Sequence, residues 1–302
     1  MQPVNEYAHG RPSAALRPYV AFYTGYRQRG LTPAVHRGLP SPYLTLIVTL
    51  DEPLVVAAHP DRRQPPGRYA SLLGGLHVTP ALITHDGCQS GVQVAVRPLG
   101  CRALLGLPAG EIAAVDVDVR DVLGAVAEEL LDRVRAATGW PERFATVDAV
   151  LARRLSSGPA FVAPEVTYAW DTVLRTGGSA RVAEIVAEIG WSARHLTARF
   201  RTEVGLGVKQ AARVVRFDVA RRRLQAAAVH GTPRLADLAA TAGYFDQAHL
   251  AREFGELAGC SPTRWLAEEI GNVQALPPEP DQNGRHDRQR TAAAGMADPA
   301  GP

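Results

Sequence analysis

The stretch Gly243–Phe254, GYFDQAHLAREF, combines a glycine turn with the start of an amphipathic helix. Leu250 and Phe254 are four residues apart, which places both side chains on one face of a helix. His249 and Arg252 lie on the same expected helix. The stretch alone fits an ordinary amphipathic helix, part of a catalytic site, or a helix that contacts something outside the protein.

A second copy of this pattern lies upstream in the chain. The first segment is VAEIVAEIGWSARHLTARFRTEVGLGVKQ from Val182, and the second is LADLAATAGYFDQAHLAREFGELAGCSPTRW from Leu235. Each has a short apolar helix, a glycine followed by an aromatic residue, and a polar helix with His-Leu and a Phe four residues after the Leu. The second His-Leu follows the first by 54 residues, and the second copy has one more residue between its glycine and its histidine. The repeat indicates one supersecondary unit used twice.

Each unit has the plan of a helix–turn–helix, with a supporting helix, a tight glycine turn and a second helix at a steep angle. In such motifs the N-terminal part of the second helix enters the major groove of DNA. The positions expected to face the core are Leu196, Phe200, Leu250, Phe254 and Leu257. The positions expected to face outward are Arg194, Thr197, Arg201, Gln247, Ala248, His249 and Arg252.

A long helix of about 20 residues is expected between the units, near Val208–Ala227. At ~1.5 Å per residue it would span roughly 30 Å, close to the ~34 Å between successive major grooves. A rigid connector of this length would let both second helices contact one face of a duplex.

Positive charge gathers in the same region. The whole chain has a net charge of only +3, but Trp191–Gln225 holds nine Lys/Arg against two acids. Localised basic charge favours a polyanionic partner, although a solvated helical face is the alternative. Lys209 is the only lysine in this segment. Arginine binds phosphate as a fork and stacks on bases, so the composition suits nucleic acid.

The N-terminal half has the pattern of a β domain. Short runs separated by Gly, Pro and Asp predict strands at Tyr43–Leu50, Leu54–Ala58, Tyr69–Leu73, Ala81–His85 and Val92–Arg97. Short strands with close turns are typical of a small, cupin-like barrel or sandwich. Three helices are expected afterwards, at about Gly100–Leu105, Val122–Ala136 and Arg143–Leu155.

The chain is therefore predicted to be α+β, with a β-rich domain at residues 1–157 and an all-helical domain at 164–272. Ser156–Pro159 is interpreted as a hinge. The segment 273–302 is rich in Pro, Gly, Asp and Arg and is predicted to be a disordered tail.

Enzymatic and metal-binding motifs are not found. The sequence contains no nucleophile elbow, phosphate-binding loop or dinucleotide fingerprint, so we predict neither catalysis nor a cofactor. His85-Asp86 beside Cys88 is interpreted as a turn between strands. The histidines of the β half have no HxH or HxxxH spacing, and no metal is expected there.

The three cysteines, Cys88, Cys101 and Cys260, are few and far apart, which argues against a disulfide framework. No signal peptide is recognised, and the longest apolar stretch is too short to span a bilayer. A cytoplasmic protein without a membrane partner is expected.

The segment from Val182 to Leu266 resembles the C-terminal DNA-binding domain of AraC/XylS-type transcriptional regulators. The matching residues are Gly243, Tyr244, Asp246, Gln247, His249, Leu250, Arg252, Phe254, Gly259, Ser261 and Pro262. The resemblance implies a sequence-specific regulator that binds double-stranded promoter or operator DNA. The predicted DNA contacts are Ser192, Arg194, His195, Thr197, Ala198, Arg201, Arg213, Arg216, Asp246, Gln247, Ala248, His249 and Arg252.

The chain departs from this family pattern at three places, one of which is Gly207-Val208, where Ser-Pro is common. Phe245 stands where a small capping residue is usual, so Asp246 is expected to cap the helix instead. Ala198 replaces a usual arginine, and Arg199 after it is expected to point partly toward the protein.

For the N-terminal domain the resemblance implies sensing of a small molecule, homodimerisation, or both. The segments Arg37–Ser41 and Val96–Gly100 are similar to sensor domains of some family members, but they identify no ligand. Two alternatives stay open: an N-terminal enzyme, and a dimerisation module without a ligand.

Overall fold

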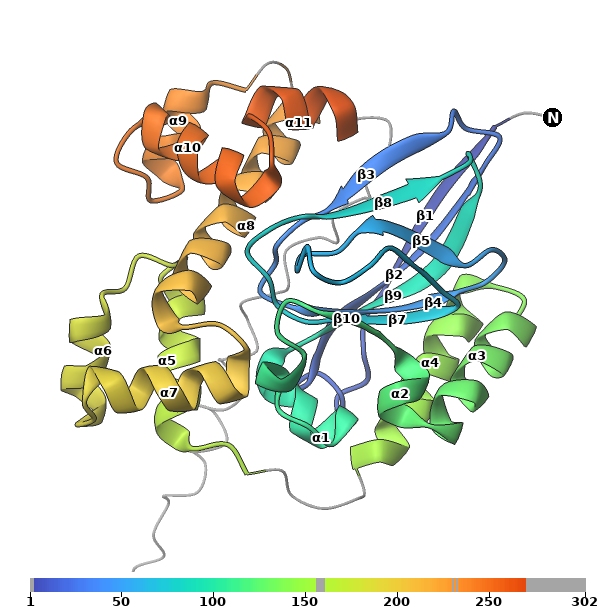
Figure 1. Cartoon of the computed structure of the whole chain (residues 1–302), viewed down its shortest axis with the longest axis horizontal. Helices are drawn as coiled ribbons and strands as arrows, with labels where there is room; N and C mark the ends of the chain where they lie inside the picture. The colour runs from blue at the N-terminus through green and yellow to red at the C-terminus, as the bar shows by residue number, and fades with distance from the viewer. Residues whose placement is uncertain (1–2, 156–160, 230, 232, 270–302) are drawn as a thin grey trace, which may run out of the picture.

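The computed structural model describes residues 3–155, 161–229, 231 and 233–269, and it confirms the α+β class. The N-terminal half contains two β-sheets and several helices, and the described elements from Pro164 to Glu269 are all helices (Figure 1). The expected hinge at Ser156–Pro159 and the expected tail at 273–302 lie outside the described residues.

Ten strands form two antiparallel sheets. The larger sheet has the order β1-β2-β9-β4-β7-β10, and the smaller has the order β3-β8-β5-β6. Strands of the larger sheet are β1 (Val4–Gly10), β2 (Val20–Arg29), β4 (Leu44–Thr49), β7 (Ser71–Gly74), β9 (Gln89–Val96) and β10 (Asp116–Asp118). Strands of the smaller sheet are β3 (Ala34–Gly38), β5 (Leu54–Ala58), β6 (Gly67–Tyr69) and β8 (Ala81–His85).

The strands expected from strong apolar runs, such as Tyr43–Leu50 and Leu54–Ala58, are confirmed as β4 and β5. Other strands were predicted only in part or not at all. The expected strand Tyr69–Leu73 is divided, because the chain passes from β6 in the smaller sheet to β7 in the larger one. The strands β1, β2 and β3 were not expected. In β2 the pattern is interrupted by Gly25, where a Cβ would lie 2.3 Å from the Trp140 ring, so the glycine is required by packing.

Residues on both faces of β4, an inner strand of the larger sheet, are buried, which explains its continuous apolar run. Leu46 and Val48 belong to the main core together with buried residues of the helices that follow the sheets. Ile47, on the opposite face of β4, packs with Leu54, Val56, Leu72 and Ile83 in a second, smaller core.

The helices after the sheets begin with α1 (Cys101–Leu105). One predicted helix is interrupted at Gly124, whose φ of +54° ends α2 (Val119–Leu123) before α3 (Ala125–Ala136) begins. The next helix, α4 (Trp140–Arg154), places Phe144 in a stacked contact with Tyr23 of β2, 5.9 Å between ring centroids.

Two buried histidines face each other across strands β3 and β8. His36 and His85 are 5% and 9% exposed, and their ring centroids are 6.0 Å apart. Burial, followed by the charge of His85, lowers the pKa of His36 to about 4. His36 is therefore neutral in the folded protein at neutral pH.

This burial predicts a loss of stability in mild acid. The folded-state pKa of His36 is lowered, so below about pH 6.5 the unfolded chain binds a proton that the folded chain excludes. The free energy of unfolding should be highest above pH 6.5 and fall by roughly 2 kcal/mol for this group between pH 7.5 and pH 5. Urea titrations of the wild type and of His36→Phe at pH 7.5 and pH 5 measure this loss of unfolding free energy. Equal losses in the two proteins would contradict the assignment.

Seven helices follow: α5 (Pro164–Arg175), α6 (Val182–Ile189), α7 (Ala193–Val204), α8 (Val208–Val229), α9 (Leu235–Thr241), α10 (Gln247–Ala258) and α11 (Pro262–Glu269). The expected helix positions are confirmed, and the 22-residue α8 separates the two repeated pairs. At ~1.5 Å per residue, α8 is about 33 Å long. None of the helices in the described ranges is long and apolar enough to cross a membrane.

The helical half packs directly against the β half. A Cβ on Gly110, in the 3₁₀ turn Ala109–Ile112, would lie 2.6 Å from the carbonyl oxygens of Arg201 and Thr202 at the end of α7. Beside it, the Arg102 guanidinium donates to both carboxylate oxygens of Glu203 at 2.7 and 2.9 Å. Glu203 is only 3% exposed, so the hydrogen bonds from Arg102 replace those that its carboxylate would make with water.

Removing Arg102 should leave the buried Glu203 carboxylate without a partner. We expect Arg102→Ala to lower the free energy of unfolding by about 1–3 kcal/mol, because an unsatisfied buried charge retains its desolvation cost. Urea denaturation provides the measurement. The matched control is Arg133→Ala, which breaks the exposed pair with Glu129 and should cost less than ~1 kcal/mol. Equal losses would show that the interdomain pair has no special role.

Candidate nucleic-acid interface

The first helix–turn–helix unit consists of α6 and α7. Gly190 ends α6 with a φ of +72°, a conformation that favours glycine. The Ser192 hydroxyl then caps α7 by accepting the backbone N–H of His195 at 3.2 Å. Leu196 and Phe200 are fully buried, as the sequence predicts. These inward anchors determine which side of α7 faces outward.

The outward side of α7 is basic and open. The exposed residues at its start and along its length are Ser192, Arg194, His195, Thr197, Ala198, Arg199 and Arg201. Within the described ranges, none of the three arginines is paired with a carboxylate. Arg199 was expected to point partly toward the protein, but it is exposed, since its long side chain reaches solvent beside the buried Leu196. The His195 ring contacts the Trp191 ring edge to face, 4.4 Å between centroids.

The second unit consists of α9 and α10 and repeats this construction. Gly243 has a φ of +79° in the turn. The Asp246 carboxylate accepts the His249 backbone N–H at 2.6 Å, which confirms that Asp246 caps α10. Leu250 and Phe254 are fully buried, with the Phe254 ring centroid 4.9 Å from that of Phe217 in α8.

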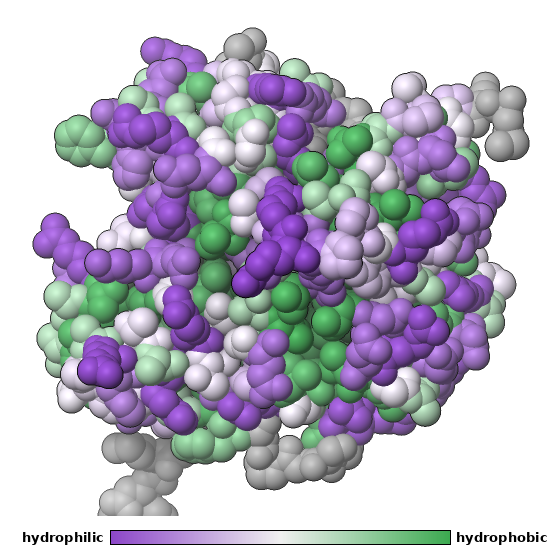
Figure 2. Space-filling model, in the orientation of Figure 1, coloured by the Kyte–Doolittle hydropathy of each residue, from purple (hydrophilic) through white to green (hydrophobic). Residues whose placement is uncertain are grey.

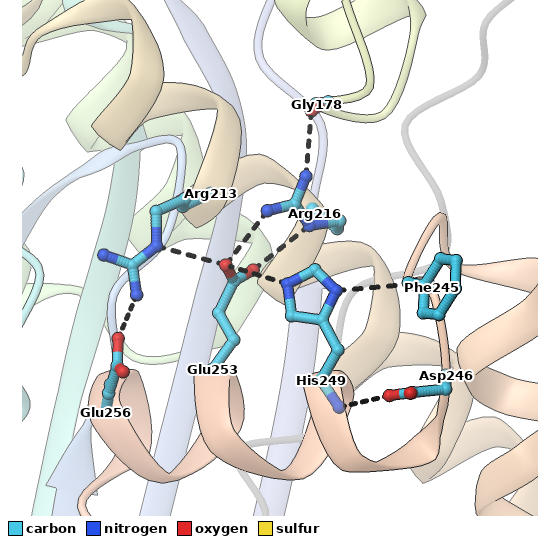
Figure 3. Close-up of polar contacts among 8 residues, drawn as sticks. All are labelled: Gly178, Arg213, Arg216, Phe245, Asp246, His249, Glu253 and Glu256. Carbon is cyan, nitrogen blue, oxygen red and sulfur yellow. Dashed lines mark hydrogen bonds and ion pairs between the residues drawn. The ribbon is translucent and has the colours of Figure 1, made fainter.

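The outward side of α10 presents Gln247, Ala248 and Arg252, which are all exposed. His249, which the sequence places on this outward side, is turned partly inward. Its Nδ1 accepts the Phe245 backbone N–H at 3.3 Å, and its Nε2 lies 3.9 Å from the Glu253 carboxylate (Figure 3). Both ring nitrogens thus face groups of the protein, and the DNA contact of His249 stays a prediction.

A buried carboxylate joins α10 to α8. Glu253 is 5% exposed and accepts hydrogen bonds from Arg213 at 3.1 Å and from Arg216 at 3.1 and 2.9 Å. Arg216 also donates to the Gly178 carbonyl oxygen at 3.3 Å, and Arg213 also pairs with Glu256 (Figure 3). Burial opposes the charge of Arg216, but the hydrogen bonds and charge of Glu253 outweigh it and raise the pKa of Arg216.

Arg213 and Arg216, predicted as DNA contacts, are therefore brought to Glu253 and away from the exposed faces of α7 and α10. Internal pairs or exposure to solvent were expected for about half of the arginines of the connecting helix, but the sequence alone does not identify Glu253 as the partner. The available signal was an acid at position 253, directly before the buried Phe254, because a carboxylate on the inward side of a helix requires a cationic partner. Farther along α8, Arg221 and Arg222 pair with buried Asp218 at 2.5 and 2.8 Å.

Removal of the Glu253 carboxylate should destabilise the helical half strongly. Glu253→Ala leaves two partly buried guanidinium groups next to each other, and we expect a loss of about 2–4 kcal/mol in the free energy of unfolding. Chemical denaturation followed by circular dichroism gives this value. Glu256→Ala is the matched control, because its carboxylate is 64% exposed and its pair should contribute less than ~1 kcal/mol. A small loss for Glu253→Ala would mean that the network does not hold α10 in place.

Comparison with known proteins locates two families in the chain. A model described as a helix-turn-helix domain matches residues 185–268, which include most of α6 and all of α7 to α10. A model described as a domain of unknown function, DUF6597, matches residues 8–118, which include most of both sheets. None of the curated proteins compared matches the chain.

Several solved structures are similar to the chain at low identity. ToxT from Vibrio cholerae is 10% identical, with 82% of this chain and 97% of that chain covered and a TM-score of 0.47. The C-terminal domain of AraT, a response regulator from Geobacillus stearothermophilus, is 16% identical, with 42% of this chain and 99% of that one covered and a TM-score of 0.33. The AraC-like transcriptional activator CuxR is 14% identical, with 70% and 78% covered and a TM-score of 0.29.

The two capped helix pairs and the matching family model define the class of the helical half. The chain has a C-terminal helix-turn-helix domain of the AraC type, a family of DNA-binding transcription regulators, joined to an N-terminal DUF6597 domain.

Proposed function

We propose that the protein is a cytoplasmic, sequence-specific transcription regulator, and that α7 and α10 enter successive major grooves of one duplex. The observation that supports this most is the division of the arginines. Arg213, Arg216, Arg221 and Arg222 of α8 pair with buried acids, and Arg223 donates to the Thr241 carbonyl oxygen. In contrast, Arg194, Arg201 and Arg252 on the second helices are exposed and have no carboxylate partner in the described chain. The length of α8, about 33 Å, matches the ~34 Å spacing of grooves.

The proposed contacts divide by chemistry. Arg194, Thr197, Gln247 and Arg252 would contact base edges, because arginine suits guanine and glutamine suits adenine. Arg201 would bind phosphate. Ser192, Ala198 and Ala248 are small residues near the helix starts and would permit close approach of the backbone to the duplex. Asp246 would act through its cap on α10, and His195 and His249 are proposed as further contacts. Arg213 and Arg216 would reach DNA only by leaving Glu253, so we assign them to positioning α10.

The test begins with selection of duplexes from a random library by the full-length protein. On the selected duplex, Arg252→Ala should weaken binding by about 1–3 kcal/mol and relax specificity at one base pair. Titration of labelled duplex at several salt concentrations provides the measurement, because phosphate contacts make affinity fall steeply with salt. The matched control is Arg63→Ala, an arginine outside both units whose side chain is 91% exposed. An equal loss on selected and random DNA would refute base contact by Arg252.

For the N-terminal domain we propose a sensing role. A cleft of about 280 Å³ lies at one end of the two sheets, with Tyr26, Thr49, Leu54, His85 and Gln89 among its lining residues. A mixed apolar and polar lining of this kind suits a small organic ligand. A thermal-shift screen of the whole protein tests ligand binding, and sedimentation tests homodimerisation. Dimers without any ligand response would favour a dimerisation module, and turnover of a ligand would favour an enzyme.

A further inference from the structure

Phe245 is the residue by which the second helix–turn–helix unit differs in length from the first. In the first unit the cap Ser192 directly follows Trp191. In the second unit Phe245 stands between Tyr244 and the cap Asp246.

The contacts of the two turns establish this alignment independently of sequence. Each cap accepts the N–H of the histidine three residues later, His195 in one unit and His249 in the other. Each of these histidines also makes an edge-to-face contact with the aromatic residue of its turn, at 4.4 Å for Trp191 and 5.2 Å for Tyr244. Because both neighbours of Phe245 have counterparts in the first unit, Phe245 itself is the additional residue.

The backbone of Phe245 is fixed by a hydrogen bond, while its side chain is exposed to solvent. The Phe245 N–H donates to His249 Nδ1 at 3.3 Å, which places the residue beside the first turn of α10 (Figure 3). Its side chain is 92% exposed, more than Phe161 at 75% or Val35 at 56%. An aromatic ring so exposed at the start of the helix that presents Gln247 and Arg252 is available to a partner of that helix.

We propose that Phe245 contacts the 5-methyl group of a thymine in the major groove occupied by α10. This inference rests on the proposed function. The thymine methyl is the apolar group on base edges in the major groove, and phenylalanine is a side chain that contacts it. A phosphate contact is disfavoured, since the ring has no donor and the adjacent Asp246 carboxylate repels phosphate. Phe245 would thus add specificity for thymine to the second unit alone.

The test uses the full-length protein and a duplex that it has selected from a random library. Each thymine is replaced in turn by uracil, which removes only the 5-methyl group. At one thymine the replacement should weaken wild-type binding about fourfold, the factor expected for one buried methyl group. Phe245→Ala should bind the thymine duplex at least fourfold more weakly and should be indifferent to uracil at that position. Phe245→Leu, which keeps an apolar side chain, should retain the dependence on the methyl group.

Matched controls separate this contact from loss of folding. Phe161→Ala removes another exposed phenylalanine, outside both units, and should leave binding unchanged. The thermal unfolding midpoint of Phe245→Ala should equal that of the wild type, because the side chain is not buried. The proposal is overturned if Phe245→Ala keeps the wild-type uracil profile, or if it weakens binding equally on every duplex. If the wild type selects no sequence at all, the proposed function fails as well, which distinguishes the two failures.

Discussion

The buried Glu253 carboxylate is the interaction on which the arrangement of the helical half depends. A carboxylate in that position is stable only with its cationic partners in place, and both partners come from α8. Arg216 also reaches the Gly178 carbonyl oxygen in the turn between α5 and α6. The Glu253 carboxylate and its two arginines therefore connect the second unit, the connecting helix α8 and the turn that precedes the first unit. This link holds α10 against α8 and against the turn that leads into α6.

The basic residues of the segment form two populations with different physical roles. Arg213 and Arg216 pair with Glu253, and Arg213 also pairs with Glu256, while Arg221 and Arg222 share the carboxylate of Asp218. The open positive charge is concentrated on α7, while α10 presents mainly Gln247 and Arg252. If both units bind DNA as proposed, the first unit supplies more of the positive charge that attracts phosphate, and both units supply base contacts.

The helical half could be predicted from sequence because its caps and anchors repeat at fixed spacing: Ser192 and Asp246 begin helices, and the buried leucine and phenylalanine positions follow. The pairing of Arg213 with Glu253 could not be predicted, since the two residues are 40 positions apart and meet only through the packing of α8 on α10. In the β half, strand β2 was missed because Gly25 accommodates Trp140 from a distant helix. A residue such as Gly25, which is selected by a contact with a distant helix, cannot be recognised from the local pattern of apolar and polar residues.

The position of α7 has a consequence for regulation. Arg201, on its exposed side, and Glu203, on its buried side, are two residues apart, and Glu203 is paired with Arg102 of the β half. The carbonyl oxygens of Arg201 and Thr202 lie against Gly110, where no side chain would fit. If α7 enters a groove, a shift of that helix alters its contacts with the β half. Coupling of two binding events is reciprocal, so a ligand that moves the segment around Gly110 changes DNA affinity by the same factor by which DNA changes the affinity for that ligand.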